Sequence, residues 1–179
     1  MNDYWKTIDG YFDFQSVYDR AVSSAVDGDI FVELGVYKGK SLCYLCSRIM
    51  ESGKKIYVHG VDMFVGMNTT PGGESSSKIV LNNIRAIGAT DICTLHEMPT
   101  VDSANIFENG SVKFAFIDAC HEYECVSDDI KAWVVKIKPG GMLAGHDYSS
   151  RWPGVVKAVN EAFPGIEVLG NSWLKLINT

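Results

Sequence analysis

The chain has 179 residues, a formal net charge of −6 and a hydrophobic content of 46%. Its length fits a single domain of residues 1–179, and its acidic balance disfavours DNA or RNA as a partner, because nucleic-acid sites are usually basic. No apolar run approaches the ~18 residues that cross a membrane. The first residues lack the layout of a signal peptide, and the five cysteines at irregular spacing indicate reduced thiols. We therefore expect a cytoplasmic protein with no membrane or nucleic-acid partner.

Hydrophobic spacing predicts strands and helices in alternation. Apolar residues from Phe14 to Ala25 predict a helix within 11–27, an N-terminal helical segment that precedes a core at 28–179. The patterns then predict, in chain order, strand 29–34, helix 41–50, strand 56–62, a loop at 63–77, a helix ending near 87, strand 91–96, a short helix at 99–107, strand 112–118, helix 123–136, a turn at 139–141, strand 142–145, helix 153–162, and strands 166–169 and 172–177. This alternation indicates an α/β, Rossmann-like, doubly wound and mostly parallel sheet with helices on both faces.

The segment 30–41 predicts a ligand site, because a buried strand runs there into a glycine turn and the start of a helix. Glu33 precedes Gly35 and Gly39 in this turn. Glycines let a ligand approach the backbone, and N–H groups at a helix start face it. The carboxylate would repel a phosphate, and the spacing matches neither G-x-G-x-x-G nor a phosphate-binding P-loop. The turn therefore favours a ligand with cationic or hydroxyl groups.

Ionisable residues also end the other predicted strands. Asp62 ends the second strand, where an acid typically accepts hydrogen bonds from ribose hydroxyls. Glu97, Asp118 and the pair His146–Asp147 follow later strands. Ligands of such sheets bind beyond the carboxyl ends of the strands, so these side chains are expected to face one site.

Four motifs in order resemble the class I S-adenosylmethionine-dependent methyltransferases. They are the turn at 30–41, Asp62, the run 116–124, and the pair of segments 137–141 and 145–148. The resemblance covers roughly residues 28–150 and is to the small O-methyltransferase group that includes macrocin-type sugar methyltransferases and cephalosporin-hydroxylase-like proteins. It implies a seven-stranded sheet with an antiparallel last strand. It also implies methylation of a hydroxylated small molecule or sugar.

The same resemblance implies which residues bind the cofactor, S-adenosylmethionine. Glu33, Gly35 and Gly39 would hold its methionine half, Asp62 its ribose, and Glu97 would lie near its adenine. The full implied set is Glu33, Gly35, Tyr37, Gly39, Ser41, Asp62, Met63, Glu97 and Asp118.

Related O-methyltransferases carry a divalent metal, and the resemblance implies that Asp118, His146 and Asp147 would bind it here. His146 stands where relatives often have an acid, and imidazole favours Mn²⁺, Fe²⁺ or Zn²⁺ over Mg²⁺. Cys120 stands where the family often has another acid. His121 thus becomes the candidate base, since an imidazole pKa near 6.5 suits proton removal, and Asp118 is the second catalytic candidate.

Two other functions remain open from the sequence. The changes at Cys120 and His146 are compatible with a non-catalytic protein that binds S-adenosylmethionine or assists assembly. A dinucleotide-dependent oxidoreductase would use Asp62 to bind the ribose, but this chain lacks the G-x-G-x-x-G fingerprint of such enzymes. The short segment before the first strand leaves part of the acceptor site to other loops or to a partner subunit, which makes a homo-oligomer a further expectation.

Overall fold

The computed structural model describes residues 3–64 and 76–178. Most of the loop predicted at 63–77 lies outside these residues. The described elements are, in chain order, the 3₁₀ helix η1 (Asp3–Thr7), α1 (Gln15–Ser24), β1 (Ile30–Leu34), α2 (Lys40–Ser52), β2 (Tyr57–Asp62), α3 (Ser77–Ile87), β3 (Cys93–Glu97), α4 (Thr100–Ser103), the 3₁₀ helix η2 (Ala104–Ile106), β4 (Val112–Ile117), α5 (Tyr123–Val134), β5 (Ile137–Gly145), α6 (Pro153–Ala162), β6 (Glu167–Leu169) and β7 (Ser172–Leu176).

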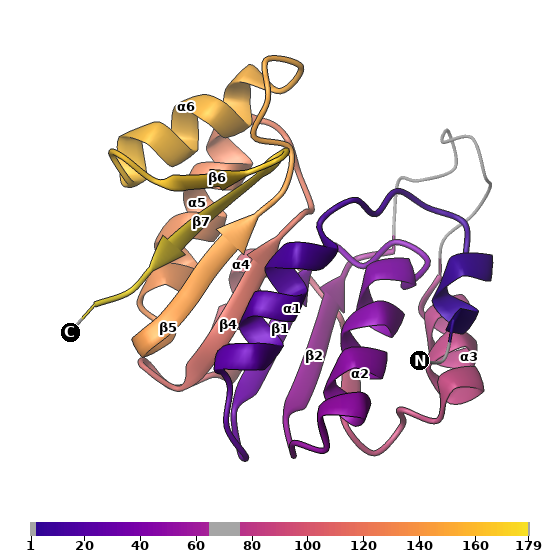
Figure 1. Cartoon of the computed structure of the whole chain (residues 1–179). Coiled ribbons are helices and arrows are strands. Elements are labelled where there is room, and N and C mark those ends of the chain that lie inside the picture. Colours follow the sequence, from indigo (N-terminus) through magenta and orange to yellow (C-terminus); the bar gives the residue numbers. More distant parts are fainter. Residues whose placement is uncertain (1–2, 65–75, 179) are drawn as a thin grey trace.

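The strands form one seven-stranded sheet in the order β3-β2-β1-β4-β5-β7-β6 (Figure 1). Neighbouring pairs from β3 to β5 are parallel, whereas β7 runs antiparallel to β5 and to β6. The predicted α/β class, the strand number and the antiparallel last strand are therefore confirmed. The strand order reverses between β1 and β4, which is where such sheets bind their ligands.

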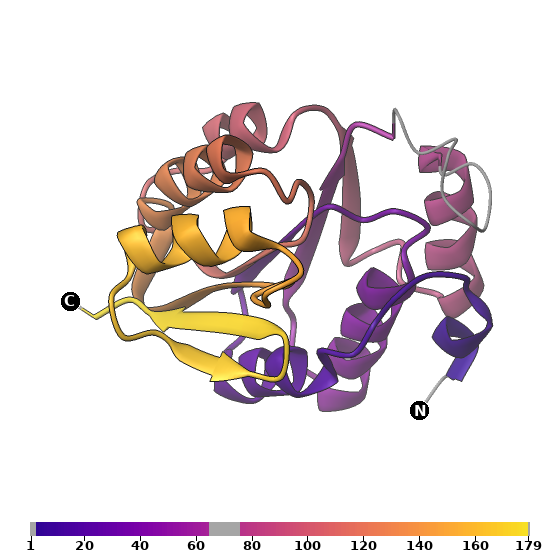
Figure 2. The same ribbon diagram turned by 90° about the horizontal axis from the view of Figure 1, so that it is seen from above.

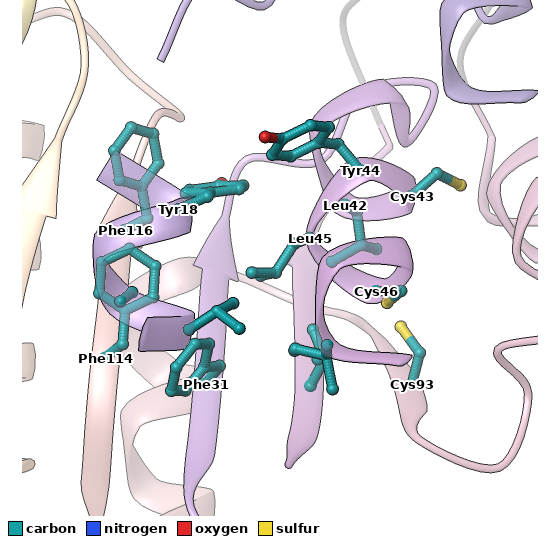
Figure 3. Packing of buried hydrophobic residues seen from close by; sticks show 14 of the residues in the cluster. Tyr18, Phe31, Leu42, Cys43, Tyr44, Leu45, Cys46, Cys93, Phe114 and Phe116 are labelled. Carbon is teal, nitrogen blue, oxygen red and sulfur yellow. The ribbon is translucent and has the colours of Figure 1, made fainter. Parts of the chain in front are cut away.

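Each face of the sheet has its own hydrophobic core. Along β1, Phe31 belongs to the cluster under α1, α2 and α3, whereas Val32 belongs to the cluster under η2, α5 and α6, as the alternation of side chains along a strand requires. Figure 2 shows the two helix layers on opposite sides of the sheet. In the first cluster, Tyr18 packs on Phe114 and Phe116 with ring centroids 5.7 and 5.1 Å apart (Figure 3).

The N-terminal helix is shorter than the predicted range 11–27. It begins at Gln15 and ends at Ser24, and η1 precedes it. Gly10 has a φ of 138°, and the run before Gln15 places Phe12 and Phe14 edge to face with centroids 4.8 Å apart. Aromatic packing against the core therefore replaces helix in this stretch.

The last parallel strand begins earlier than predicted. Residues 139–141 were expected to form a turn before a strand at 142–145, but β5 extends from Ile137 because Ile137 pairs with Val112. The register then shifts, and the next pair is Phe114 with Met142. Gly140 lies in this bulge with a φ of 72°. The predicted turn is thus an irregularity within the strand.

The cysteines among the described residues form no disulfide. Cys43 and Cys46 are buried on α2, and the sulfur of Cys46 faces that of Cys93 in Figure 3, so this C-x-x-C pair belongs to the hydrophobic core. Within 3–64 and 76–178, no helix has the length and hydropathy to cross a membrane.

Candidate active site

A cavity of about 560 Å³ lies at the carboxyl ends of β1, β2 and β4. This size is typical of a small-molecule site. Its wall includes six of the predicted cofactor residues: Gly35, Tyr37, Ser41, Asp62, Met63 and Asp118. Gly10 and Tyr11 from the N-terminal segment also line it, together with residues of α4 and α5. The predicted edge of the sheet therefore carries a real cavity.

Gly35 lets the backbones of two turns meet at this cavity. Its φ is +90°, and a Cβ at this position would lie 2.0 Å from the carbonyl oxygen of Asp118. The N–H of Asp118 donates to the carbonyl of Leu34 over 2.7 Å, and the N–H of Gly35 donates to that of Val61 over 2.9 Å. A side chain at residue 35 would separate the β1–α2 turn from the β4–α5 turn.

Glu33 lies beneath the turn and is 1% exposed. The Tyr18 hydroxyl donates to its Oε2 atom over 2.8 Å, and the Ser41 hydroxyl donates to its Oε1 atom over 2.7 Å. Burial raises the pKa of Glu33 to about 8. Among the described residues, Glu33 does not line the cavity, whereas Ser41 does. The contact of Glu33 with the site is therefore the hydrogen bond that fixes Ser41.

Asp62 holds the turn through the backbone. Its Oδ2 atom accepts the N–H groups of Val36 and Tyr37 over 2.8 and 2.9 Å, and its Oδ1 atom accepts that of Phe64 over 2.8 Å. A carboxylate offers about four acceptor sites. Asp62 thus retains room for one further donor, such as a ligand hydroxyl.

Besides Glu33, two further predicted cofactor residues lie outside the described cavity wall. Gly39 is the N-cap of α2 with a φ of 83°, so it shapes the turn. Glu97 is exposed at the end of β3 and accepts a hydrogen bond from the Ser77 hydroxyl over 2.7 Å.

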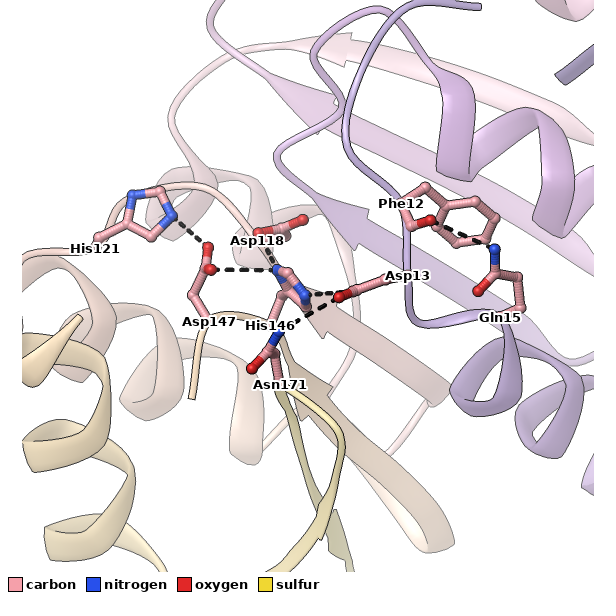
Figure 4. Close-up of polar contacts among 8 residues, drawn as sticks. All are labelled: Phe12, Asp13, Gln15, Asp118, His121, His146, Asp147 and Asn171. Carbon is pink, nitrogen blue, oxygen red and sulfur yellow. Dashed lines mark hydrogen bonds and ion pairs between the residues drawn. The ribbon is translucent and has the colours of Figure 1, made fainter. Parts of the chain in front are cut away.

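A polar cluster borders the cavity at Asp118 (Figure 4). Asp118, His121 and Asp147 each offer a ligand atom within 4.8 Å of the others. The Nε2 atom of His121 lies 2.6 Å from Oδ2 of Asp147. Burial raises the pKa of Asp118 to about 6, and the hydrogen bond to Asp147 raises the pKa of His121 above its usual value. The cluster can therefore accept a proton or hold a cation.

His146 lies beside this cluster but is held from another side. Its Nε2 atom is 2.7 Å from Oδ1 of Asp13, while its Nδ1 atom lies 3.5 Å from Asp147 and 3.8 Å from Asp118. Burial lowers the pKa of His146, but contacts with these carboxylates outweigh it and raise the value to about 9. Asn171 also donates to Asp13 over 3.3 Å.

The sequence reasoning missed Asp13 and Asn171, and it favoured a core or interface role for Trp152 over a role in the site. The Trp152 ring stacks on His121 with centroids 4.0 Å apart and an interplanar angle of 20°. None of the three lies in a motif, and they reach the cluster through tertiary packing. The one available signal was a lone acid between Phe12 and Phe14.

The model of a family described as a methyltransferase domain matches residues 32–148, which is more than half of the chain. The chain belongs to this methyltransferase family. The match includes the glycine turn, Asp62 and the polar cluster. Together with the strand order, it confirms the predicted class I, S-adenosylmethionine-dependent methyltransferase. No curated protein sequence matches the chain.

Several methyltransferases of known structure have the same fold as this chain. The O-methyltransferase NovP aligns over 92% of this chain and 79% of its own, with a TM-score of 0.73 and 19% identity. CalS11, a TDP-rhamnose 3′-O-methyltransferase of calicheamicin biosynthesis, aligns over 90% and 76%, with a TM-score of 0.68 and 17% identity. A geranyl diphosphate methyltransferase in complex with SAM aligns over 83% and 62%, with a TM-score of 0.59 and 15% identity.

Proposed function

We propose that this methyltransferase methylates a hydroxyl group of a small molecule, and that the acceptor is a sugar. The observation that carries the proposal is the polar cluster of Asp118, His121 and Asp147 at the border of the cavity. Methylation of a hydroxyl releases a proton, and this cluster offers an acceptor for it. The named activities of NovP and CalS11 support an O-methyltransferase.

The cavity fits S-adenosylmethionine in size and in the chemistry of its wall. The cofactor supplies an electrophilic methyl group on a sulfonium. Among the described residues, the cavity wall has no phosphate-type glycine loop, and Asp62 keeps an acceptor site for a hydroxyl. We assign the ribose to Asp62 and the methionine half to the turn around Gly35 and Ser41. Alignment of the two reactants in such a site contributes about 7–11 kcal/mol in favourable cases.

His121 is our candidate for the proton acceptor. Its Nε2 atom is oriented by Asp147, and its ring plane is fixed by Trp152. This arrangement supports removal of a hydroxyl proton by a positioned imidazole, which typically contributes a factor of about 10²–10⁴. Asp118 would assist by holding the acceptor.

A divalent ion also fits between the two acids of this cluster and the neighbouring His146. A small cavity of about 10 Å³ is lined by Asp118, His121, His146 and Asp147, which is room for about one water molecule. We propose Asp118, Asp147 and Nδ1 of His146 as ligands, because Asp13 binds the other ring nitrogen, as carboxylates commonly do for ligating histidines. A bound ion would act as a Lewis acid on the acceptor hydroxyl.

The test compares two histidine variants with the wild type. Binding of S-adenosylhomocysteine and of Mn²⁺ is measured by calorimetry, and methyl transfer is measured on a panel of nucleotide sugars with and without a chelator. His121→Ala is expected to retain both ligands and lose about 10²–10⁴-fold in kcat, whereas His146→Ala is expected to lose Mn²⁺ affinity.

If His121→Ala instead lost Mn²⁺ affinity and His146→Ala lost turnover with both ligands bound, the roles of base and metal ligand would be exchanged. Binding of the cofactor without turnover on any hydroxylated acceptor would favour the non-catalytic alternative. No binding of the cofactor at all would overturn the proposed function.

A further inference from the structure

Cys120 and Cys125, which we name the cavity pair, are two thiols that the proposed chemistry does not use. Cys120 lies in the turn between β4 and α5, and Cys125 lies in the first turn of α5. Both line the main cavity, where Cys125 is exposed and Cys120 is half-buried. A hydrogen bond between the two thiols, together with burial, raises the pKa of Cys125 to about 11. The two sulfurs are therefore neighbours in a place that a dissolved oxidant can reach.

The chain holds a second pair of contacting thiols, which serves as a comparison. Cys46 and Cys93, which we name the core pair, are also hydrogen-bonded to each other. Both are buried in the hydrophobic cluster between α2 and β3 (Figure 3). Oxidation of a thiol requires access of the oxidant as well as a neighbouring thiol. Of the two pairs, the cavity pair is therefore the one that oxidises in the folded protein.

The turn that carries Cys120 is packed tightly on both sides. A Cβ at Gly35 would lie 2.0 Å from the carbonyl oxygen of Asp118, and a Cβ at Gly154 would lie 2.6 Å from the carbonyl oxygen of His121. Cys120 stands between these two contacts in the sequence, and it also lines the small cavity of the polar cluster. A turn held in this way cannot move at Cys120 without moving Asp118 and His121 as well.

We infer that Cys120 and Cys125 form a reversible disulfide, and that this bond weakens ligand binding in the main cavity. A disulfide brings its sulfurs to about 2 Å of each other, which is closer than hydrogen-bonded thiols lie. Its formation draws Cys120 along the cavity wall towards α5 and displaces the packed turn. The effect on binding rests on the proposed function, because it takes the adenosyl cofactor as the ligand of the cavity.

The oxidant is a small-molecule disulfide, and the reaction consists of two exchanges. The sulfur of one cysteine attacks a sulfur of the oxidant, which forms a mixed disulfide and releases one small thiol. The sulfur of the other cysteine then attacks the protein sulfur of the mixed disulfide, closes the new bond and releases the second small thiol. The cavity pair thus loses two electrons to the oxidant, and its two protons leave with the released thiols. An excess of a small thiol reverses both exchanges.

The first part of the test locates the disulfide. The folded protein is equilibrated in buffers with different ratios of reduced to oxidised glutathione, its free thiols are alkylated, and its tryptic peptides are analysed by mass spectrometry. Trypsin cleaves after Lys113 and Lys131, so the cavity pair lies on one peptide and the core pair on two others. We expect the shared peptide to lose two hydrogens in oxidising buffers, while the core pair stays reduced and is alkylated only after unfolding.

The second part measures the coupling between this bond and the ligand. Calorimetry gives the affinity for S-adenosylhomocysteine in reducing and in oxidising buffer. Coupled sites typically change each other's affinity by about 5- to 150-fold, and we expect a loss within this range on oxidation. The effect is reciprocal by linkage. Saturating S-adenosylhomocysteine should therefore lower the equilibrium constant for oxidation of the cavity pair by the same factor.

Cysteine variants separate the two pairs. Cys120→Ser and Cys125→Ser each remove one half of the cavity pair, so the affinity of either variant should be the same in reducing and in oxidising buffer. Serine at the exposed position 125 also keeps the test independent of changes in the packed turn. Cys93→Ala is the matched control, because it breaks the core pair and should retain the full response to oxidation.

Each outcome decides the inference. Absence of the internal bond, or a stable mixed disulfide with glutathione in its place, would overturn it. A bond that forms without changing the affinity would overturn the coupling and leave the proposed function intact. Oxidation of the core pair in the same buffers would show that unfolding exposes the thiols, and would also overturn the inference. A wild type that binds no S-adenosylhomocysteine in either state would overturn the proposed function and the coupling with it, while the peptide masses would still decide the disulfide.

Discussion

At Gly35 two backbone turns meet with no room for a side chain. We predict that Gly35→Ala destabilises the protein by about 2–5 kcal/mol, because the left-handed backbone costs about 1–2 kcal/mol for an L-residue and the overlap with the carbonyl of Asp118 forces a further shift. Urea unfolding would measure the change. Gly53→Ala is the control, since Gly53 has a φ of +70° but no atom within 4 Å of the added Cβ. Equal losses in the two variants would show that contact with Asp118 is unimportant.

Glu33 makes the stability of the ligand-free protein dependent on pH. Its folded pKa of about 8 lies above the ordinary value of 4.5, so the folded state keeps a proton that the unfolded state releases between these values. The free energy of unfolding should therefore fall as the pH rises from about 5 to 8, by up to about 1.4 kcal/mol per pH unit. Glu33→Gln should remove this contribution, and urea unfolding at several pH values would measure the difference between the two proteins. A constant difference across this range would contradict the prediction.

Among the elements, the N-terminal segment contributes more to the site than its sequence suggests. It is tied down by the ion pair of Lys38 with Asp9, 2.8 Å apart, and by the contact of Asp13 with His146. We predict that Asp13→Asn weakens Mn²⁺ binding by about 10- to 100-fold, because partners of a ligating histidine typically contribute that much. Calorimetry with S-adenosylhomocysteine present would measure it. Asp3→Asn, in an exposed pair with Lys6, should leave the affinity unchanged, and a shared loss would refute the orienting role.

The sequence predicts elements well where a local pattern decides them. Strands β1 and β2 and their acids follow from apolar runs that end at glycine or at an acid, and the alternation alone implies the sheet. Local patterns misplace the ends of an element where packing between distant segments sets them. Helix α1 starts late because Phe12 and Phe14 pack on the core, and β5 starts early because Ile137 pairs with Val112.

At the scale of the whole molecule, ligand binding and stability should be coupled. A ligand at about 100 times its Kd stabilises the folded state by about 2.7 kcal/mol, which corresponds to about 5–10 °C in Tm for a domain of this size. We predict such a shift with S-adenosylhomocysteine, and its loss in Asp62→Ala. Thermal unfolding with NAD at the same concentration tests the oxidoreductase alternative. A shift with NAD and none with S-adenosylhomocysteine would reverse the assignment.

The order of strands also has a consequence during synthesis. β7 lies between β5 and β6 and pairs with both, yet at Ser172–Leu176 it is the last of the described strands to be synthesised. Until those residues leave the ribosome, the outer edge of β5 has no partner, and the nascent chain presents an open strand to its neighbours. At about 5–20 residues per second this interval is brief, but an open edge is a template for misassembly. Chains truncated before Ser172 should therefore need a chaperone, whereas chains that extend past Leu176 should not.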